Sequence, residues 1–341
     1  MTYPPPIRSL DDVRALISGL PGPDAEARAA CARREPNLTK PPGSLGRLEE
    51  LSLWLSSWQG RHPPGVVRVR ARVFAANHGV AKRGVSAYPT DVTAQMVANF
   101  EAGGAAINQL CRAFGVELKV DALALEHPTR DFTEAPAMDE DECVDAIAAG
   151  LAAVEPGTDL LCLGEMGIAN STAAAALCHA LYGGEAALWA GPGTGLDGDG
   201  VAAKAFVVAE AVAFHGRALS DGLEIMRRLG GRELAAIAGA VIGARLLSVP
   251  VLLDGYCCTA AAAVLLGLNE SALDHCQVGH ASAEPGHRRL MERIGKAPLL
   301  DLDMRLGEAS GAVLAVAIVR AAAACHAGMS TFAEAGVSDK G

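Results

Sequence analysis

The chain has 341 residues, half of them hydrophobic, and a formal net charge of −10 at pH 7. This negative charge argues against a nucleic-acid-binding surface, so we expect no nucleic-acid partner. The most apolar segment, residues 311–324, is shorter than a bilayer span and contains Arg320, so we expect no membrane association. The N-terminal segment lacks the basic and apolar regions of a signal peptide, which indicates a cytoplasmic protein.

The nine cysteines show neither CxxC pairs nor the spacing of metal ligands, although Cys257 and Cys258 are adjacent. A chain of this length can bury a core large enough to be stable without disulfides. We therefore expect reduced and mostly buried thiols, no metal site and no cofactor.

The chain divides into three parts by its apolar pattern. Residues 1–60 show helical periodicity, residues 66–300 alternate between short apolar runs and helical segments, and an Ala-rich helix runs from Ser310 to about Gly328. We predict a large α/β catalytic domain over residues 61–309. Residues 1–60 and 310–341 are expected to pack together as a small helical domain.

Five short apolar runs end abruptly in glycine, small polar residues or a carboxylate, and a helical segment follows each of them. Runs too short for a helix that end at glycine are typical of buried parallel strands. The carboxyl ends of parallel strands share one edge of the sheet, where ligands bind. We therefore predict that the turns after the five runs line one site. The runs are residues 72–76, 159–163, 186–190, 249–253 and 275–278.

Two of these turns have the composition of anion-binding loops. In GEMGIANS, either Asn170 or Ser171 is expected to cap the following helix and to leave backbone N–H groups free for an anion. In GPGTG, the glycines Gly193 and Gly195 allow close backbone approach and Thr194 adds a hydroxyl. One such turn is most often a plain strand–helix connection, but two at one sheet edge favour a nucleotide-sized ligand.

The same turns exclude several familiar sites. GPGTG lacks the GK[ST] ending of a P-loop and the full GxGxxG dinucleotide fingerprint, and no serine lies in a GxSxG elbow. Lys204 follows in the next helical segment and could supply one positive charge to a phosphate monoester. Two carboxylates are candidates for acid–base chemistry, Glu165 in the first turn and Glu308 just before Ser310, which we expect to cap the last long helix. On position alone, the favoured interpretation is that Glu308 only complements the helix dipole.

Eight motifs that occur in order identify a family resemblance. They are TKPPGSLGRLEELS, GVSAYPTDVTAQMVANF, GEMGIANSTAAAAL, GTGLD, LLDGY, SAEPGH, LDMRLGEASGA and FAEAGVSD. From about residue 39 to residue 339 the chain resembles the nicotinate-nucleotide–dimethylbenzimidazole phosphoribosyltransferases, enzymes of cobalamin lower-ligand assembly. The resemblance implies a Rossmann-like domain with helices on both faces of a parallel sheet, a small domain built from both chain ends, and a homodimer.

The resemblance also implies a reaction and its residues. Nicotinate mononucleotide and 5,6-dimethylbenzimidazole would give α-ribazole 5′-phosphate and nicotinate, with inversion at the anomeric carbon. Glu308 would be the general base, and Glu165 would orient substrate or stabilise the ribosyl cation. The implied azole-binding residues are Ser86, Tyr88, Gln95, Met166 and Leu306. The implied phosphate and ribose ligands are Gly167, Asn170, Gly193, Thr194, Gly195, Lys204 and Ser282, with Asp254 as a ribose hydroxyl acceptor.

Three positions depart from the family pattern. Ala169 stands where glycine is usual, which is compatible with the turn only if its φ is negative. Pro192 supplies no backbone N–H, and Asn77 replaces an acidic residue before HGV. His78 and His280 could be acid–base groups or turn histidines bonded to backbone.

Two other functions are compatible with parts of this pattern. A non-catalytic binder of benzimidazoles or ribazoles would need no base at Glu308, and a dehydrogenase using the GTG turn would need a nicotinamide cofactor.

Overall fold

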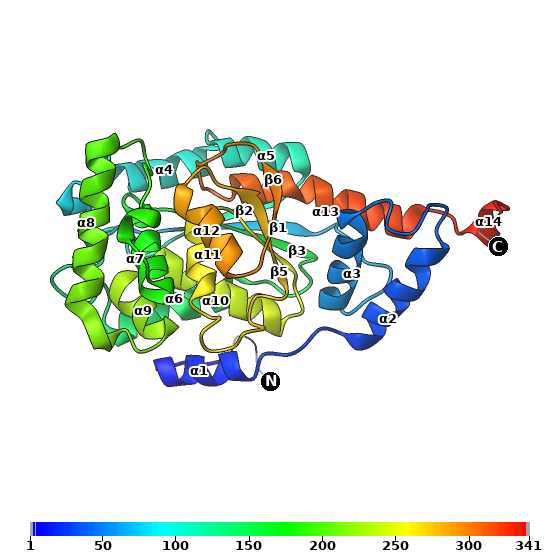
Figure 1. Cartoon of the computed structure of the whole chain (residues 1–341), viewed down its shortest axis with the longest axis horizontal. Helices are drawn as coiled ribbons and strands as arrows, with labels where there is room; N and C mark the ends of the chain where they lie inside the picture. Colours follow the sequence, from blue (N-terminus) through cyan, green and yellow to red (C-terminus); the bar gives the residue numbers. More distant parts are fainter. Residues whose placement is uncertain (1–2, 4, 339–341) are drawn as a thin grey trace.

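The computed structural model describes residue 3 and residues 5–338 and contains one six-stranded parallel sheet (Figure 1). The spatial order is β2-β1-β3-β4-β5-β6, and every neighbouring pair is parallel. This arrangement confirms the predicted α/β class. The strands are β1 (Val69–Ala75), β2 (Glu117–Ala122), β3 (Leu160–Met166), β4 (Val251–Leu253), β5 (Cys276–Ala281) and β6 (Pro298–Asp301).

Four of the five predicted runs form strands, and the prediction for residues 186–190 was wrong. This run contains the 3₁₀ helix η3 (Ala186–Leu188) and the buried Trp189, whose indole N–H donates to the Gly183 carbonyl. Its apolar side chains pack against neighbouring helices instead of entering the sheet. Strands β2 and β6 were not predicted because both are partly exposed edge strands, and β6 begins with a proline.

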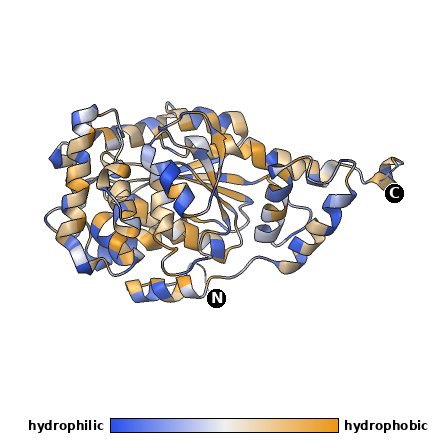
Figure 2. Cartoon of the chain, viewed as in Figure 1, coloured by the Kyte–Doolittle hydropathy of each residue, from blue (hydrophilic) through white to orange (hydrophobic). Residues whose placement is uncertain are grey.

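Alternating side chains of the central strands enter two separate cores. In β3, Leu160 and Cys162 belong to one core, whereas Leu161 and Leu163 belong to the other. Successive residues of a strand point to opposite faces, so continuous apolar runs are what a sheet covered on both sides requires. Figure 2 shows the hydrophobic residues concentrated in these strands, with helices of mixed hydropathy around them.

The larger core lies between the sheet and most of the helices. Alanine, leucine and valine dominate it, as the low aromatic content of the sequence requires. The helices on this side are α1 (Leu10–Ser18), α6 (Glu140–Ala153), α7 (Asn170–Tyr182), α8 (Gly198–His215), α9 (Gly222–Leu229), α10 (Arg232–Leu246), α11 (Tyr256–Ala263) and α12 (Pro285–Arg293).

The second core joins the opposite face of the sheet to both ends of the chain. Its central element is α13 (Ser310–Gly328), whose apolar side chains contact the sheet and α3 (Arg47–Gln59). The Ser52 hydroxyl of α3 donates to the Ala322 carbonyl of α13 at 2.9 Å. Helices α4 (Asp91–Ala102) and α5 (Ala106–Phe114) also contribute to this core. The remaining helices of the chain are α2 (Ala25–Arg34), which packs on α3, and the terminal α14 (Phe332–Ala335).

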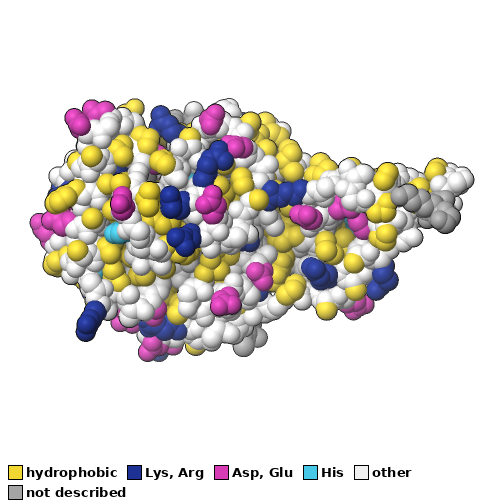
Figure 3. All heavy atoms as spheres, viewed as in Figure 1, with side chains coloured by type: hydrophobic (Ala, Val, Ile, Leu, Met, Phe, Trp, Pro, Cys, Tyr) yellow, Lys and Arg dark blue, Asp and Glu magenta, His cyan; other side chains and the backbone are white. Residues whose placement is uncertain are grey.

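Helices α2, α3 and α14 lie at one end of the molecule and project from the α/β body together with the end of α13 (Figures 1 and 3). Helix α1 lies elsewhere, because the Leu10 N–H donates to Glu140 of α6 and Arg14 pairs with Asp221. The outermost residues of the predicted small domain, 1, 2, 4 and 339–341, lie outside the described residues.

Within the described residues, one helix, α13, is long and apolar enough to cross a membrane by length and composition. It is longer than the apolar segment 311–324 that the sequence analysis considered. Half of its most apolar window is buried inside the fold, which is typical of a core helix. On the face shown in Figure 3, acidic and basic side chains are interspersed.

Candidate active site

A cavity of about 490 Å³ lies at the carboxyl ends of the strands, where the sequence predicted a ligand site. This volume suits a small-molecule substrate. Residues that follow β3, β4 and β5 line it, together with α4, the GPGTG turn and the loop before α13. The NHGV turn after β1 does not contribute to the lining.

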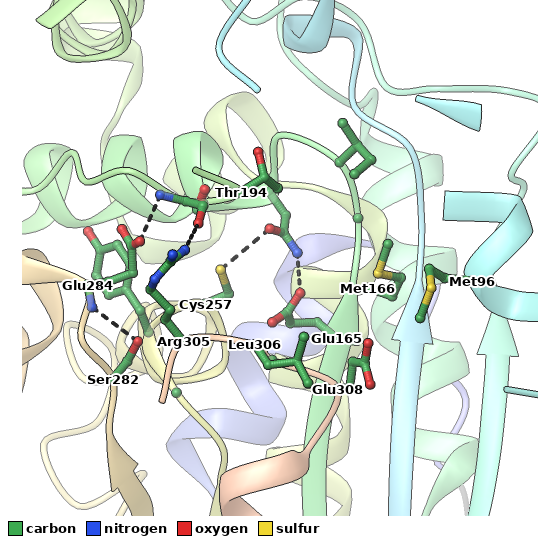
Figure 4. A pocket seen from close by; sticks show the side chains of 18 of the residues that line it. Met96, Glu165, Met166, Thr194, Cys257, Ser282, Glu284, Arg305, Leu306 and Glu308 are labelled. Atoms are coloured by element: carbon green, nitrogen blue, oxygen red, sulfur yellow. Dashed lines mark hydrogen bonds between the residues drawn. The ribbon is translucent and has the colours of Figure 1, made fainter. Parts of the chain in front are cut away.

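Figure 4 shows that the cavity has an apolar half and a polar half, with Glu165 and Glu308 between them. Met96 and Met166 lie on one side of the two carboxyl groups, and Thr194, Ser282, Glu284 and Arg305 lie on the other. This division is suited to a flat apolar group and a polar or anionic group bound next to each other.

Glu165 lies near the end of β3, where a buried carboxyl group would be costly without partners. The Asn170 side-chain amide donates to Oε2, and Gly307 lies so close to Oε1 that a side chain there would collide with it. Burial, together with the nearby charges of Asp254 and Glu233, raises the pKa of Glu165 to about 8. At pH 7 this carboxyl group is therefore mainly protonated.

Glu308 lies in the loop immediately before α13 and is 4% exposed. Its backbone N–H donates to the Glu165 carbonyl at 3.2 Å, and both Glu308 and Ala309 have a φ of 63°. Non-glycine residues in this left-handed region store strain, which is concentrated at functional sites. Burial, with the Asp254 charge adding to it, raises the pKa of Glu308 to about 7. Oε2 has no hydrogen-bond partner among the described residues.

Asp254 lies behind this pair of glutamates and is fully buried, outside the residues that line the cavity. Its Oδ1 accepts the backbone N–H groups of Gly311 (2.7 Å) and Ala312 (2.9 Å), so it caps α13 from a distant strand. The prediction that Ser310 caps this helix was wrong, because the Ser310 hydroxyl instead donates to the Gly307 carbonyl. Burial raises the pKa of Asp254 to about 6.

The GEMGIANS turn brings Gly167, Asn170 and Ser171 to the cavity wall. The prediction that Asn170 or Ser171 caps α7 was wrong, because the Asn170 amide is bonded to Glu165 and the Ser171 hydroxyl accepts from Lys204. Ala169 precedes the helix with a φ of 77°, so the condition that its φ be negative is not met. The alanine adopts the conformation that glycine would adopt without strain.

The GPGTG turn brings Gly193 and Thr194 to the polar end, whereas Gly195 does not line the cavity. Lys204 is fully buried beneath the turn, where its Nζ donates to Ser171 Oγ (2.9 Å) and to the Gly191 carbonyl (3.1 Å). Burial lowers the pKa of Lys204. The Gly193 N–H donates to a Glu284 carboxylate oxygen at 2.8 Å, so the buried Glu284 side chain fixes the position of this turn. Pro192 accepts the N–H groups of Gly195 and Leu196 through its carbonyl.

Of the residues implied for azole binding, Tyr88, Met166 and Leu306 line the cavity. Gln95 is exposed on α4 and Ser86 is half-buried, and neither lines it. The sequence analysis missed Val92 and Met96, which face the cavity from α4. Their position one helical turn apart is the signal that could have revealed this wall.

The polar half contains further residues that the sequence did not single out as ligands. Ser282 was expected there, but Glu284, Arg305 and Cys257 also line it. Arg305 donates to the Gly193 carbonyl at 2.9 Å and so bridges the RLGE loop and the GPGTG turn. His280 lies at the end of β5 in the cavity wall, and His78 is instead buried in a pair with Glu233.

The described residues contain no group of three or more His, Cys, Asp or Glu side chains placed to hold a metal ion. The nine cysteines are free, and all except Cys325 are buried.

A parallel α/β sheet whose strand ends hold two buried carboxyl groups in one cavity, between an apolar half and a polar half, has the architecture of an enzyme that binds a small molecule. Residues 20–337 match the model of a family described as Phosphoribosyltransferase, and the chain belongs to this family.

Named relatives agree over nearly the whole chain. A nicotinate-nucleotide–dimethylbenzimidazole phosphoribosyltransferase from Sinorhizobium medicae (strain WSM419) is 58% identical over 330 residues, which cover 97% of each chain. An enzyme of the same name from Ruegeria sp. (strain TM1040) is 57% identical over 335 residues, covering 98% of this chain and 99% of the relative.

A solved structure of a protein of this name from Thermus thermophilus superposes with a TM-score of 0.85 and 41% identity. It covers 93% of this chain and 100% of that one. The resemblance seen in the sequence is thereby confirmed.

Proposed function

We propose that this phosphoribosyltransferase transfers the phosphoribosyl group of nicotinate mononucleotide to 5,6-dimethylbenzimidazole, giving α-ribazole 5′-phosphate and nicotinate. The names of the relatives support these substrates. The observation that carries the proposal is the unpartnered carboxylate oxygen of Glu308, buried between an apolar slot and the anion turn.

Glu308 is the general base of this proposal. A neutral benzimidazole is a weak nucleophile until its ring N–H proton is removed. Glu308 takes that proton while the other ring nitrogen attacks C1′ of the ribose. The C1′–nitrogen bond to nicotinate breaks on the opposite face, its electron pair neutralises the pyridinium ring, and the β configuration becomes α. A base with a pKa of about 7 is suited to this step at neutral pH.

Glu165 is proposed to orient the ribose and to stabilise its cationic character. Its raised pKa keeps the carboxyl group mainly neutral at pH 7. A positively charged substrate next to it favours ionisation, so charge on Glu165 develops where positive charge accumulates. The Asn170 amide fixes the orientation of the carboxyl group.

The phosphate is proposed to bind at the GPGTG turn. Gly193 and Thr194 face the cavity, and Lys204 supplies positive charge from beneath through Ser171. The Thr194 hydroxyl and one buried cation suit a phosphate monoester, whereas the N–H groups of Gly193 and Gly195 already donate within the protein. Asp254, behind the cavity wall, would reach the ribose only through a neighbouring side chain.

The azole is proposed to occupy the apolar half of the cavity beside Met96 and Met166. Tyr88 and Leu306 also line the cavity and are both exposed to solvent. Methionine side chains adapt to a flat aromatic ring and make favourable sulfur–aromatic contacts.

We also propose that the protein is a cytoplasmic homodimer, with α2, α3 and the end of α13 forming a small unit at the end of each chain. Helix α8 lies at the opposite end of the molecule (Figure 1). It carries an exposed apolar stripe of the kind that marks protein interfaces. Two aromatic side chains dominate this stripe, Phe206 at 67% and Phe214 at 55% exposure. Replacement of Phe206 by Glu tests it, because sedimentation should then shift toward the monomer.

The reaction is tested by incubating the protein with nicotinate mononucleotide and dimethylbenzimidazole and detecting the product by mass. Formation of α-ribazole phosphate with equimolar nicotinate is the expected result. Tight binding of the azole with no product would instead identify a non-catalytic binder.

A further inference from the structure

His280 is buried in the wall of the cavity, and its ring has no hydrogen-bond partner among the described residues. It is 1% exposed at the end of β5, and neither ring nitrogen is hydrogen-bonded within the described part of the chain. A buried polar group without a hydrogen-bond partner destabilises the fold, and native structures contain few of them. Because His280 lines the cavity, a group of the bound substrate is the natural partner.

Two glycines make room for the imidazole ring. A Cβ atom at Gly311 would lie 1.9 Å from His280 Cδ2, and one at Gly255 would lie 3.0 Å from Nε2. Any side chain at Gly311 would displace the ring. The space for His280 is therefore built by the first turn of α13 and by the residue that follows Asp254.

Asp254 determines which ring nitrogen is available. Its Oδ1 lies 3.5 Å from His280 Nε2 and is itself held by two N–H groups of α13. A nearby carboxylate favours the tautomer that carries its proton on Nε2. Nδ1 is then left as a hydrogen-bond acceptor, which requires an O–H or N–H donor.

The chemistry of the substrates leaves few such donors. In ionised nicotinate mononucleotide, the carboxylate and the phosphate are acceptors, and the pyridinium ring has no N–H. The only hydrogen-bond donors of this substrate are the two ribose hydroxyl groups. The ring N–H of the azole is already assigned to Glu308, on the far side of the cavity centre from Ser282 (Figure 4).

We propose that His280 accepts a hydrogen bond from a ribose hydroxyl group of the nucleotide and that Asp254 orients it. This inference rests on the proposed function. His280 thereby selects ribosyl over deoxyribosyl donors, and Asp254 acts as a positioning residue. Ser282, whose hydroxyl oxygen accepts the Glu284 N–H at 3.3 Å, keeps its own O–H for a second contact beside His280.

The test compares nicotinate mononucleotide with its 2′-deoxy and 3′-deoxy analogues in wild type and in His280→Ala. When one partner of a buried hydrogen bond is removed and the other is left unsatisfied, kcat/KM should fall about ten- to a hundred-fold. We expect one analogue to suffer this loss in wild type, and we expect His280→Ala to reduce that difference to within about three-fold. An unchanged ratio in the variant would overturn the proposal.

Two further measurements separate the possible failures. If wild type makes no ribazole phosphate, only the proposed reaction is refuted. Calorimetric measurement of the binding of the same analogues then still tests the role of His280. Absence of nucleotide binding to wild type would refute both proposals. Nicotinamide mononucleotide tests whether His280 contacts the nicotinate carboxylate instead. A loss of affinity that is specific to this analogue and disappears in His280→Ala would place His280 at the nicotinate ring and overturn the ribose contact.

His275→Asn is the matched control. His275 is equally buried, but Nε2 lies 3.0 Å from the Val241 carbonyl and Nδ1 lies 3.3 Å from Arg245, outside the cavity. This variant should lose stability while keeping the wild-type preference for the hydroxyl group. Loss of the preference in both variants would show that it depends on general packing.

Discussion

The hydroxyl oxygens of Ser86 and Thr194 lie 2.9 Å apart, and the same Thr194 oxygen accepts the Ala87 N–H at 3.0 Å. Ser86 belongs to the loop expected to contact the azole, and Thr194 belongs to the turn expected to contact the phosphate. The two proposed half-sites are therefore connected directly. A phosphate group that engages the Thr194 hydroxyl would change the hydrogen bonding of the azole loop.

The first prediction tests this connection with Thr194→Val, which keeps the shape of the side chain and removes its hydroxyl. Neutral hydrogen bonds contribute about 0.5–1.5 kcal/mol each, so we expect a loss of up to about ten-fold in azole affinity as well as in nucleotide affinity. Fluorescence or calorimetric titration with each substrate measures both. Thr172→Val is the control, because the Thr172 hydroxyl is buried in α7 without a partner among the described residues. Azole affinity unchanged in Thr194→Val would mean that the two loops are independent.

The second prediction concerns Glu308. Replacement by Gln removes the base and leaves the shape of the cavity, so turnover should fall by roughly two to four orders of magnitude. Azole binding should stay within a few-fold. Single-turnover product formation measures the chemical step directly, and a rate near that of wild type at neutral pH would exclude Glu308 as the base.

The pH profile is the control for this role. The pKa of Glu308 is raised to about 7, so the group is mainly protonated below that pH and mainly ionised above it. Only the ionised form accepts a proton, so the wild-type rate should rise with pH, level off above about pH 7 and lose roughly ten-fold per pH unit below it. The residual rate of Glu308→Gln should lack this rise. A rise of the same size in the variant would assign it to another group.

The third prediction concerns Lys204. Its buried ammonium group lies beneath the GPGTG turn, where the phosphate is proposed to bind, so Lys204→Ala should weaken nicotinate mononucleotide much more than the azole. Charge-assisted hydrogen bonds contribute about 1.5–3 kcal/mol, which corresponds to roughly a ten- to hundred-fold loss. Lys296→Ala is the control, because this half-buried lysine donates to the Cys276 carbonyl away from the cavity. Equal losses for both substrates would indicate that Lys204 is purely structural.

The fourth prediction concerns the strained turn at Ala169, whose φ is 77°. A left-handed alanine costs roughly 1–2 kcal/mol, whereas glycine loses about 0.5–1 kcal/mol through the entropy of the unfolded chain. Ala169→Gly should therefore stabilise the protein by about 0.5–1 kcal/mol, as measured by denaturant unfolding. Ala173→Gly, in the interior of α7, is the control and should destabilise it. Destabilisation by both substitutions would show that contacts of the Ala169 methyl group outweigh the strain.

How far the sequence predicted the structure depended on the kind of signal. Central strands such as β3 are continuous apolar runs and were found, whereas β2 alternates with polar residues at an edge and was missed. The apolar run around Trp189 was misassigned because a buried segment of that length has the same pattern in a strand and in a helical turn.

The motifs located the cavity but not the partners of its residues. Glu165, Glu308 and Ser282 lie in its wall, but Asp254 caps a helix that begins only at Ser310. Long-range caps of this kind leave no local pattern, and the neighbours of His280 come from the segment after β4 and from the first turn of α13. Only the fold brings such groups together.

The last prediction concerns α3 and α13, the two terminal helices that share a core. Leu55 of α3 is fully buried in this core with Val316 and Val319 of α13, and α13 begins two residues after Glu308. Leu55→Ala should cost about 2–5 kcal/mol of stability and, by loosening α13, should also lower kcat in protein that remains folded. Leu10→Ala is the matched control, because Leu10 is equally buried but belongs to the core on the other face of the sheet. It should reduce stability with little effect on kcat. Equal effects of the two variants on kcat, or an active and stable protein lacking residues 1–60, would refute the coupling between the terminal helices and the position of the base.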